Sequence, residues 1–418
     1  MKTVTITNAY TWYNKGDAGI LLGIVNSLKK IYKEDIEINI LSFTPEEDRK
    51  RYCKDKCIKN VESNVLNPFP FKHSKIGKIV AIIKLIVRMI YLLIMMNISM
   101  KTLASKDKSF ELMLKSDIIV VCGGGFLGGK KFDSLMHLFQ IFANTKCKKP
   151  VIMMGNSIEP IKRKIIKFFT EKILLKVDYV YARETITYQY LSEFMPKEKY
   201  ELIPDMAFML EDVIEKKEMI DKFKESHDIL FGITVRNWNF PNAVESKEIA
   251  MERYVSSIVE MMETLIQKNK AGFIFIPQVI VEYADDTEVA KKIRERLPEQ
   301  YKESFLILHD DLSPVEIKTL IGNMDYFIGT RMHSNIFATS MKVPTVAIAY
   351  EKKTNGIMET VGLQDYVVEI DQITPEKLIE KVNKSLKNRQ IIQQKLENKI
   401  PELRKEIMSK LENVFKRY

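Results

Sequence analysis

Short apolar runs alternate with longer helical patterns from one end of the chain to the other. The runs are apolar at successive positions, which is typical of strands that are covered on both faces. Six lie in the first half of the chain, KTVTITNA, IEINILSF, DIIVVCGG, VIMMGN, DYVYAR and YELIPD, and six in the second, DILFGITVR, GFIFIPQ, SFLILHD, DYFIGT, PTVAIAY and YVVEID. Strands that alternate with helices predict parallel sheets in an α/β fold. Two series of six predict two similar units.

A charged stretch at 211–228, EDVIEKKEMIDKFKESHD, lies between the two series of strands. We expect it to form a helix that links an N-terminal domain, 1–210, to a C-terminal domain, 229–374. The tail, 375–418, is highly charged and its pattern predicts helices. The length of 418 residues agrees with two domains, since a single core stops growing at roughly 250 to 300 residues.

The composition is that of an ordinary globular protein, with 46% hydrophobic and 29% charged residues and a net charge of +10. These values exclude a disordered or collagen-like chain. The four cysteines are few, and the N-terminus lacks the basic and apolar regions of a signal peptide, so we expect a cytoplasmic protein. Cys53 and Cys57 have no further ligands at a zinc spacing, and the aspartate pairs at 285–286 and 310–311 lack a third ligand. We therefore expect no metal site.

The positive charge is concentrated in one segment. No acidic residue lies between Glu62 and Asp107, and within that segment 76–100 is a long apolar helical pattern. Lys84 and Arg88 interrupt it near the middle, so it is not predicted to span a membrane. We favour a core or domain-interface helix with these two residues on its wet stripe. The alternative is a basic amphipathic surface that sits peripherally on an anionic membrane face.

The loops after the strands are the places to look for function, because ligands bind beyond the carboxyl ends of strands in doubly wound sheets. After the first strand, Asn14, Gly16 and Asp17 precede a helix. Asp17 could cap that helix, or it could act as a base or accept a hydrogen bond from a hydroxyl group. Trp12 and Tyr13 could offer a flat surface to a sugar ring.

A glycine-rich loop, GGGFLGG at 123–129, follows the strand DIIVVC. It contains G-x-G-x-x-G, but the next strand ends in Gly155 and Asn156 where a dinucleotide site needs an acid, so no nicotinamide cofactor is predicted. The amides around Gly124 and Gly125, in a glycine turn opening a helix, could approach a phosphate, a carboxylate or a sugar closely.

The loop GTRMHSN follows the strand DYFIG and opens a helix. Arg331, His333 and the amides near Ser334 and Asn335 would lie where the helix dipole favours an anion. Arginine can bind phosphate or carboxylate with two parallel hydrogen bonds, and histidine can move a proton near neutral pH. The alternative is structural: Arg331 pairs with Asp325, and His333 caps the turn.

Three further charged residues follow predicted strands, namely Asp205 in LIPDMAF, Arg236 in GITVRNWNF and Lys353 in AIAYEKKTNG. Each could be an ordinary surface charge. Together with Arg331, the two basic residues could instead hold a small, strongly anionic molecule.

These loops resemble those of the polysaccharide pyruvyl transferase family. The resemblance rests on NKGDAGIL (14–21), GGGFL (123–127), ARETIT (182–187), PDMAF (204–208), GITVR (232–236) and RMHSNIFATSMKVPTVAIAYEKK (331–353). It covers nearly the whole chain; the last segment is the most specific part and the glycine loop the least. The chain departs from the family at Ala18 and Gly19, where an acidic residue and an alanine are common, and at Lys342, where glycine is common.

The resemblance implies two Rossmann-like, doubly wound domains that face each other across a cleft, as in the GT-B fold. It also implies phosphoenolpyruvate as the donor substrate and a sugar of a cell-surface glycan, or of its lipid-linked precursor, as the acceptor. The pyruvyl group would become a ketal on two sugar hydroxyls, with release of phosphate. We expect no cofactor, no metal and no nucleic-acid partner.

The resemblance and the loop positions together assign roles to residues. The donor would contact Arg331, Arg236, Lys353 and the amides near Ser334 and Asn335.

The catalytic acid, or the group that assists departure of phosphate, would be His333, and the base would be Asp17 or Asp205. The acceptor side of the N-terminal domain would comprise Asn14, Trp12, Gly124 and Gly125.

Two other functions stay open at this point. One is a glycosyltransferase of the same architecture that uses a nucleotide sugar. The other is a relative without catalytic activity that binds a glycan.

Overall fold

The computed structural model describes residues 1–418 apart from 68–74, 129–132, 216 and 281–284. The chain forms two compact units. Unit 1 comprises Met1–Trp12, Ile20–Met209 and Glu406–Tyr418, and unit 2 comprises Tyr13–Gly19 and Leu210–Lys405. Two segments therefore depart from the order of the chain: 13–19, which we expected in the N-terminal domain, belongs to unit 2, and the last residues of the chain belong to unit 1.

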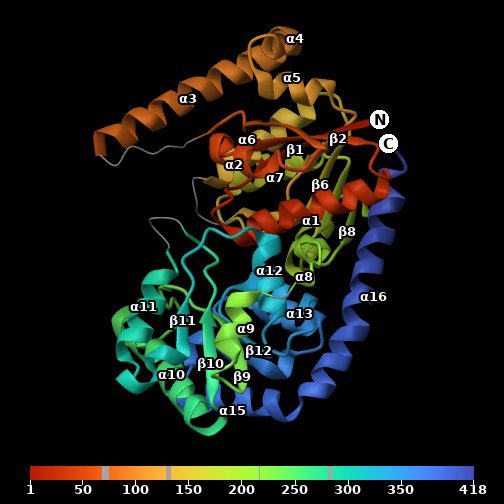
Figure 1. Cartoon of the computed structure of the whole chain (residues 1–418). Coiled ribbons are helices and arrows are strands. Elements are labelled where there is room, and N and C mark those ends of the chain that lie inside the picture. The colour runs from red at the N-terminus through yellow and green to blue at the C-terminus, as the bar shows by residue number, and fades with distance from the viewer. Residues whose placement is uncertain (68–74, 129–132, 216, 281–284) are drawn as a thin grey trace. The chain divides into compact units, whose positions relative to one another are not determined.

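Unit 1 is built on an eight-stranded sheet in which the strands pair in parallel (Figure 1). Its strands are β1 (Lys2–Ala9), β2 (Ile36–Ser42), β3 (Ile58–Ser63), β4 (Ile118–Val121), β5 (Gly124–Leu127), β6 (Val151–Ile158), β7 (Tyr179–Ala182) and β8 (Tyr200–Leu202). The spatial order is β3-β2-β1-β4-β6-β7-β8, and β5 also pairs with β6. The order reverses between β1 and β4, as in a doubly wound sheet.

Unit 2 is built on a six-stranded parallel sheet. Its strands are β9 (Ile229–Thr234), β10 (Ala271–Phe275), β11 (Phe305–Ile307), β12 (Tyr326–Gly329), β13 (Thr345–Ala349) and β14 (Val367–Glu369). The order β11-β10-β9-β12-β13-β14 reverses between β9 and β12. Both units are thus doubly wound, which confirms the predicted fold class.

All twelve predicted strands are present, and two more were missed. β3 reads IKNVES and has only two apolar residues, Ile58 and Val61. β5 reads GGFL and begins with two glycines. Polar residues and glycine are poor strand formers, so neither segment has a strand pattern of its own. Pairing with β2 and β6 decides their conformation.

The helices of unit 1 cover its sheet, whose central residues Val120, Ile152 and Val180 are fully buried. The helices are α1 (Lys15–Ile31), α2 (Pro45–Tyr52), α3 (Lys75–Ile98), α4 (Met100–Ala104), α5 (Lys108–Lys115), α6 (Asp133–Lys146), α7 (Lys164–Leu174) and α8 (Thr185–Ser192). The first residues of α1, up to Gly19, group with unit 2.

Three helices of unit 2 begin with a capping side chain, supplied by Ser246, Ser313 and Thr374. Ser313 and Glu316 form a capping box at the start of α12 (Pro314–Gly322), whose first residue is Pro314. The helices are α9 (Glu218–Lys224), α10 (Lys247–Asn269), α11 (Thr287–Arg296), α12 (Pro314–Gly322), α13 (Met332–Ser340), α14 (Lys352–Thr360), α15 (Pro375–Lys387) and α16 (Arg389–Phe415). In the segment 211–228 a helix is assigned at α9; residue 216 lies outside the described residues.

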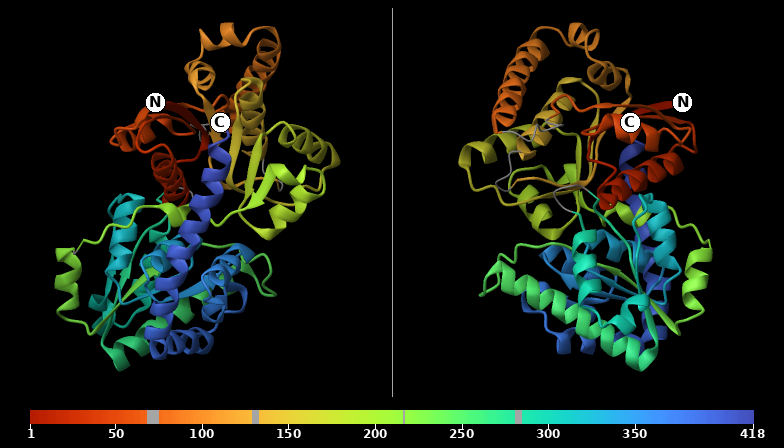
Figure 2. Two further views of the ribbon diagram at one scale, coloured as in Figure 1. Left: turned by 90° about the vertical axis from the view of Figure 1, so that its right-hand side faces the viewer. Right: turned by 60° about the vertical axis from the view of Figure 1, so that its left-hand side comes forward.

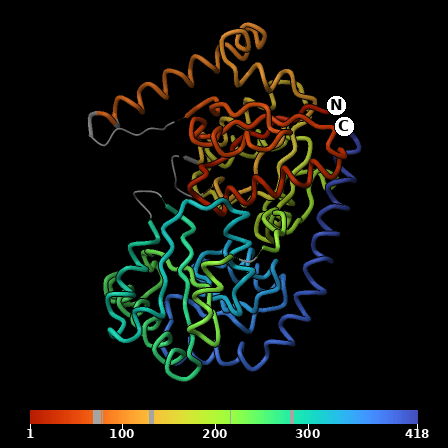
Figure 3. The backbone as a smooth tube through the Cα atoms, in the orientation of Figure 1, coloured from red at the N-terminus to blue at the C-terminus, as the bar shows by residue number. Residues whose placement is uncertain are grey.

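Short 3₁₀ helices complete the chain: η1 (Lys197–Lys199), η2 (Met206–Met209), η3 (Glu299–Ser304), η4 (Gln364–Tyr366) and η5 (Ile370–Gln372). The C-terminal end of α16 lies in unit 1, where the two ends of the chain lie side by side (Figure 3). The Lys2 ammonium donates a hydrogen bond of 2.6 Å to the backbone oxygen of Tyr418.

The long apolar helix α3 differs from its favoured prediction. Only 11% of the window Ile79–Ile98 is buried, so α3 is not a core helix. Lys84 and Arg88 are exposed, as predicted, and the Arg88 guanidinium also bonds to the carbonyl of Val65 at 2.8 Å and to Asp107 at 2.7 Å. In both views of Figure 2, α3 (orange) lies at the outside of unit 1. By length and composition alone, this helix of the described residues could span a membrane.

Candidate functional site

The reversal of strand order in unit 2 brings two predicted site loops together. Arg236 lies two residues after β9, and Arg331 lies two residues after β12. These strands are neighbours, with Gly329 opposite Thr234. The point of reversal is where doubly wound sheets bind ligands. The topology of unit 2 therefore places both arginines where a ligand is expected.

The loop after β12 is held by Thr234 at the end of β9. The Thr234 hydroxyl accepts hydrogen bonds from the backbone amides of Thr330 at 3.2 Å and Arg331 at 3.4 Å. It also lies 2.9 Å from the hydroxyl of Ser334, which in turn donates to the carbonyl of Arg331 at 2.6 Å. The Ser334 side chain is thus engaged within the loop. Any contribution of Ser334 to donor binding would come from its backbone amide.

Asn335 also stabilises the loop after β12 through its side chain. Its side chain is fully buried and donates to the carbonyl of Gly329 at 3.2 Å. A side chain on Gly329 would collide with the Asn335 carboxamide oxygen. Lys353, the third predicted cation, lies half-buried in the first turn of α14, directly after β13.

Arg331 is paired with Asp286. Its Nε lies 3.0 Å from Oδ2 of Asp286, and its Nη2 bonds to Oδ1, which makes a two-pronged ion pair. Asp286 is 1% exposed and also accepts from the backbone amide of Val279. Burial lowers the pKa of Arg331, but the Asp286 carboxylate outweighs this and raises it.

The sequence alternative that paired Arg331 with Asp325 is wrong. Asp325 instead binds Arg389 at 3.0 Å and the backbone amide of Leu230. Because Asp286 balances the charge of Arg331, this arginine brings little net charge to the site.

Arg236 supplies the net charge that Arg331 lacks. Its guanidinium lies 4.0 Å from the ring centre of Tyr350 and 4.5 Å from that of Trp238. Among the residues that the structure describes, no carboxylate forms an ion pair with it. Burial, and then the charge of Arg331, lower the pKa of Arg236 below its usual value. Asp286 and Glu351 lie close enough to raise that pKa, but neither forms an ion pair with the guanidinium, which packs against the two aromatic faces.

The loop after β1 also contributes to this site, through the segment Tyr13–Gly19. The amide of Lys15 donates to the carbonyl of Gln278 at 2.9 Å, and the amide of Ile280 donates to the carbonyl of Tyr13 at 3.2 Å. Gly16 then lies against the imidazole of His333: a Cβ at Gly16 would collide with Nδ1 of the ring. The N-K-G-D and R-M-H motifs therefore meet within unit 2.

Asp17 is oriented by Asn14. The Asn14 side-chain amide donates to Oδ2 of Asp17 at 2.6 Å, and the Asn14 carbonyl accepts from the amide of Ala18. Asn14, which directly precedes α1, is therefore the capping residue, and the prediction that Asp17 caps this helix is wrong. Asp17 lies half-buried in the first turn of α1.

Lys15 was missed by the sequence analysis. Its side chain is fully buried and forms an ion pair with Asp311. A lysine inside a polar motif gave no sign that it would be buried, because its partner lies 296 positions away. Asp286 belongs to the aspartate pair at 285–286 and Asp311 to the pair at 310–311. Both form ion pairs with basic side chains, Arg331 and Lys15. No group of three or more His, Cys, Asp or Glu residues that could hold a metal occurs in the described part of the chain.

Asp205 lies in unit 1 and is sealed there. Its side chain is fully buried and forms a 3.0 Å ion pair with Arg183, while its other oxygen accepts from the amide of Ala207 at 2.8 Å. Arg183 also donates to the hydroxyl of Ser157. A buried carboxylate with these partners is not open to a substrate hydroxyl in this structure.

Trp12 does not offer a flat surface to a sugar. It is 5% exposed, packs edge to face on Tyr52 with ring centres 5.3 Å apart, and has Arg51 over its ring. Its backbone amide donates to the buried carboxylate of Asp48 at 3.0 Å. The ring belongs to the core of unit 1.

The glycine-rich segment differs from its prediction too. Gly124 and Gly125 lie in strand β5, and Gly124 pairs with Asn156 of β6. They do not form a turn that opens a helix: α6 begins at Asp133, and Gly129 lies outside the described residues. Gly125 is exposed and Gly124 is buried. A side chain at Gly123 would collide with the carbonyl oxygen of Met154, which explains this glycine by packing.

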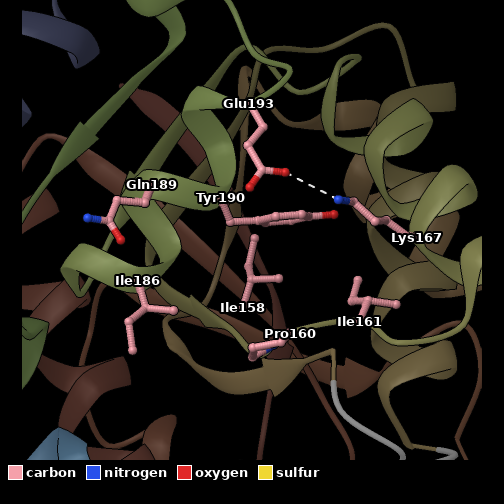
Figure 4. Close-up of a pocket in the computed structure, with 8 residues that line it drawn as sticks. All are labelled: Ile158, Pro160, Ile161, Lys167, Ile186, Gln189, Tyr190 and Glu193. Atoms are coloured by element: carbon pink, nitrogen blue, oxygen red, sulfur yellow. Dashed lines mark hydrogen bonds and ion pairs between the residues drawn. The ribbon is translucent and has the colours of Figure 1, made fainter.

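A separate pocket of about 310 Å³ lies in unit 1 at the end of β6 (Figure 4). Ile158, Ile161 and Ile186 supply apolar walls, and Lys167 and Glu193 form an ion pair of 3.2 Å at one side. Ile186 belongs to the ARETIT segment of the family resemblance, but the sequence analysis assigned no role to any residue that lines this pocket.

The amino-acid sequence is similar to that of known proteins. The family model for polysaccharide pyruvyl transferase matches residues 14–352. The amylovoran biosynthesis protein AmsJ of Erwinia amylovora is 25% identical over 421 residues, which cover 95% of this chain and 94% of that protein.

Solved structures agree on the fold. The UDP-GlcNAc 2-epimerase of Methanocaldococcus jannaschii superposes with a TM-score of 0.55 at 17% identity, covering 92% of each chain. The glycotransferase of kitacinnamycin has a TM-score of 0.54 at 9% identity, covering 100% of this chain and 98% of that one. At such low identities the likeness shows the fold alone, which is of the GT-B type. Because the family model matches residues 14–352, which are most of this chain, the chain belongs to the polysaccharide pyruvyl transferase family, a family of transferases that act on polysaccharides.

Proposed function

We propose that this protein transfers the pyruvyl group of phosphoenolpyruvate to two hydroxyls of a sugar, forming a ketal and releasing phosphate. The sugar would belong to a cell-surface glycan or to its lipid-linked precursor. The family supports a role in polysaccharide modification, and the Erwinia relative is named for amylovoran biosynthesis. The protein would act in the cytoplasm, with no cofactor.

The reaction balances without an oxidant or a reductant. A proton adds to the methylene carbon of the enol, which becomes the methyl group, and one sugar oxygen forms a bond to the neighbouring carbon. The bond from that carbon to the phosphate oxygen breaks, and the second sugar oxygen takes its place. Of the two protons that the sugar hydroxyls lose, one replaces the proton on the methyl group and the other leaves with phosphate.

The observation that carries the proposal is Arg236, a cation that forms no ion pair among the described residues, at the point of strand reversal in unit 2. Phosphoenolpyruvate bears a phosphate and a carboxylate, so it needs more positive charge than an Arg331–Asp286 pair offers. Arg236 has no carboxylate partner among the described residues, and it lies close enough to Arg331 for that charge to lower its pKa. The start of α13 adds the partial positive charge of a helix N-terminus. Lys353 would add a further cation.

His333 is our candidate for the acid, because it lies in the first turn of α13, two residues from Arg331. Asp17 is our candidate for the base. It lies in the same unit, three residues after Asn14, which orients it, and next to Gly16, which packs against His333. Asp205 is the weaker candidate, since Arg183 neutralises it inside unit 1.

A melting scan tests the donor without knowledge of the acceptor. At a concentration of about 100 times its dissociation constant, phosphoenolpyruvate should stabilise the protein by roughly 2.7 kcal/mol, since it binds the folded state only. For a domain of this size that corresponds to a rise of about 5 to 10 °C in melting temperature. Uridine, guanosine and adenosine diphosphates should have little effect.

Arg236→Met removes the guanidinium and its charge and retains an unbranched apolar stem, so it should abolish this rise. The control is Arg296→Met, which removes a partly exposed arginine that pairs with Glu252 in the same unit. Stabilisation by a nucleoside diphosphate, and none by phosphoenolpyruvate, would contradict the proposal and favour a nucleotide-sugar glycosyltransferase.

A further inference from the structure

The exposed face of α3 is the largest feature of the structure that the proposed reaction does not use. Eleven of the 24 exposed large apolar side chains in the described residues lie on this one helix. They are Ile79, Val80, Ile82, Ile83, Ile86, Val87, Ile90, Tyr91, Leu93, Ile94 and Ile98. Monomeric soluble proteins rarely expose a continuous apolar surface of this kind unless it binds a partner or a membrane.

The two faces of α3 are distinct. With 3.6 residues per turn, Ala81, Leu85, Met89, Leu92 and Met96 form one narrow stripe. Leu92 and Met96 are 0% and 5% exposed, and both belong to the hydrophobic core of unit 1. The eleven exposed side chains spread over about half of the circumference on the other side. Figure 3 shows the N-terminal half of α3 standing clear of other elements.

The charged residues on α3 itself are all basic. No acidic residue occurs between Glu62 and Asp107, whereas the exposed Lys84 lies at the border of the apolar face and the exposed Lys101 follows on α4. An apolar helix face with lysines at its border matches the boundary between acyl chains and anionic headgroups. A second copy of this chain fits less well, because two such segments would bring like charges together.

We infer that α3 lies in the plane of an anionic membrane surface, with its eleven exposed apolar side chains in the lipid. The helix does not cross the bilayer. Leu92 and Met96 hold its inner stripe in the protein core, and Arg88 ties it to Val65 and Asp107. A membrane-bound position would bring the protein to a lipid-linked acceptor, but the inference does not depend on the donor chemistry and its failure would leave the donor site unaffected.

Vesicle sedimentation tests this inference with the whole protein. Wild type should bind vesicles of phosphatidylcholine with phosphatidylglycerol, bind pure phosphatidylcholine more weakly, and lose affinity as salt is raised. The variant with Ile83→Glu, Val87→Glu and Ile94→Glu should bind anionic vesicles at least about tenfold more weakly. The three positions are 54%, 61% and 54% exposed, so the fold should persist.

A matched control carries the same change of charge elsewhere. Ile214→Glu, Val244→Glu and Ile391→Glu alter three exposed aliphatic residues of unit 2, and this variant should retain most of the binding. If the α3 glutamate variant melts early, Ile83→Ser, Val87→Ser and Ile94→Ser remove the apolar surface without new charge and should show the same loss.

Three results would overturn the inference. The first is equal binding by the α3 variants and the unit 2 control. The second is a lipid-free dimer that the α3 variants convert to a monomer while vesicle binding stays unchanged, which would identify a second copy as the partner. The third is protein that alkaline carbonate fails to release from vesicles, which would indicate a spanning helix.

Discussion

Gly16 and His333 are 317 positions apart, yet their contact leaves no space for a side chain at residue 16. Gly16 packs against the imidazole of His333. This contact also brings Asn14 and Asp17, which lie within two residues of Gly16 in the sequence, close to His333. A glycine is needed here because of a close approach, not because of its backbone conformation. The contact of Gly16 with His333 fixes which residues make up the candidate site, whereas the charge of Arg331 is already paired with Asp286.

The variant Gly16→Ala should displace the His333 ring. We expect turnover to fall at least about tenfold, because small misplacements of a reacting group are costly. The variant should still be stabilised by phosphoenolpyruvate in a melting scan, since Arg236 is untouched. Gly356→Ala is the control, because a Cβ there meets nothing within 4 Å. Full activity of Gly16→Ala would mean that the position of the ring is not critical.

His333→Ala should reduce turnover by about 10²- to 10⁴-fold, the usual contribution of a general acid or base. The fold and the stabilisation by phosphoenolpyruvate should persist. His309→Ala changes an exposed histidine of the same unit and should be neutral. Phosphate release from phosphoenolpyruvate in the presence of a glycan acceptor is the measurement. More than about a tenth of wild-type activity would defeat the role of His333. A wild-type protein that releases no phosphate would instead favour a glycan-binding relative without catalysis.

At the scale of elements, α6 is joined to β1 through a buried histidine. The Asn8 side-chain amide lies 3.1 Å from both Nδ1 and the carbonyl oxygen of His137. The ring stacks on Phe126 of β5 with centres 4.0 Å apart. Burial lowers the pKa of His137 to about 3. The fold of unit 1 therefore requires this imidazole to be neutral.

Unit 1 should lose stability as the pH falls below 6.5. The unfolded chain binds a proton at His137 there and the folded unit does not, so the loss is about 1.4 kcal/mol per pH unit. Between pH 7 and pH 5 the contribution of His137 amounts to about 2 kcal/mol. His137→Gln removes the titrating group, so its free energy of unfolding in urea should fall by that much less over the same range.

Equal losses for wild type and His137→Gln would show that the imidazole is protonated inside the fold. Asp48 titrates in the same range, because burial raises its pKa to about 6. A carboxyl group with a raised pKa loses stability as the pH rises, which is the opposite sign. Since Asp48 is present in both proteins, its effect cancels in the comparison.

At the scale of the whole molecule, the two tryptophans report on one unit each. Trp12 lies in unit 1 and Trp238 in unit 2. Trp238 contacts the guanidinium of Arg236, whereas Trp12 is packed in a core. Ligand binding at the candidate donor site should therefore alter one signal only.

In Trp12→Phe the remaining fluorescence comes from Trp238 and should change on titration with phosphoenolpyruvate. The apparent affinity should decrease with added salt, because the attraction is between a cation and an anion at a partly open site. In Trp238→Phe the signal of Trp12 should stay constant. A response from Trp12 without one from Trp238 would place the ligand in unit 1 and contradict the donor site.

Much of the fold could be read from the apolar runs, since every one of the twelve became a strand. The runs sufficed because strands buried on both faces must be apolar throughout. β3 and β5 were missed because their residues are held by neighbours and not by their own propensity. The sequence identified the loops of the candidate site but not which of their side chains form ion pairs. The partners Asp286 and Asp311 come from loops that carry no motif.

The α/β class, the family and the loops that carry polar residues followed from the amino-acid sequence alone, because they depend on local patterns and on order along the chain. Which charged side chains form ion pairs followed only from how the chain folds. Arg331 is paired with Asp286 and Lys15 with Asp311, whereas Arg236 packs against two aromatic rings. The exposure of the apolar face of α3 also followed from the fold. The physical reason is that burial and pairing are properties of side chains brought together in space, which spacing along the chain does not specify.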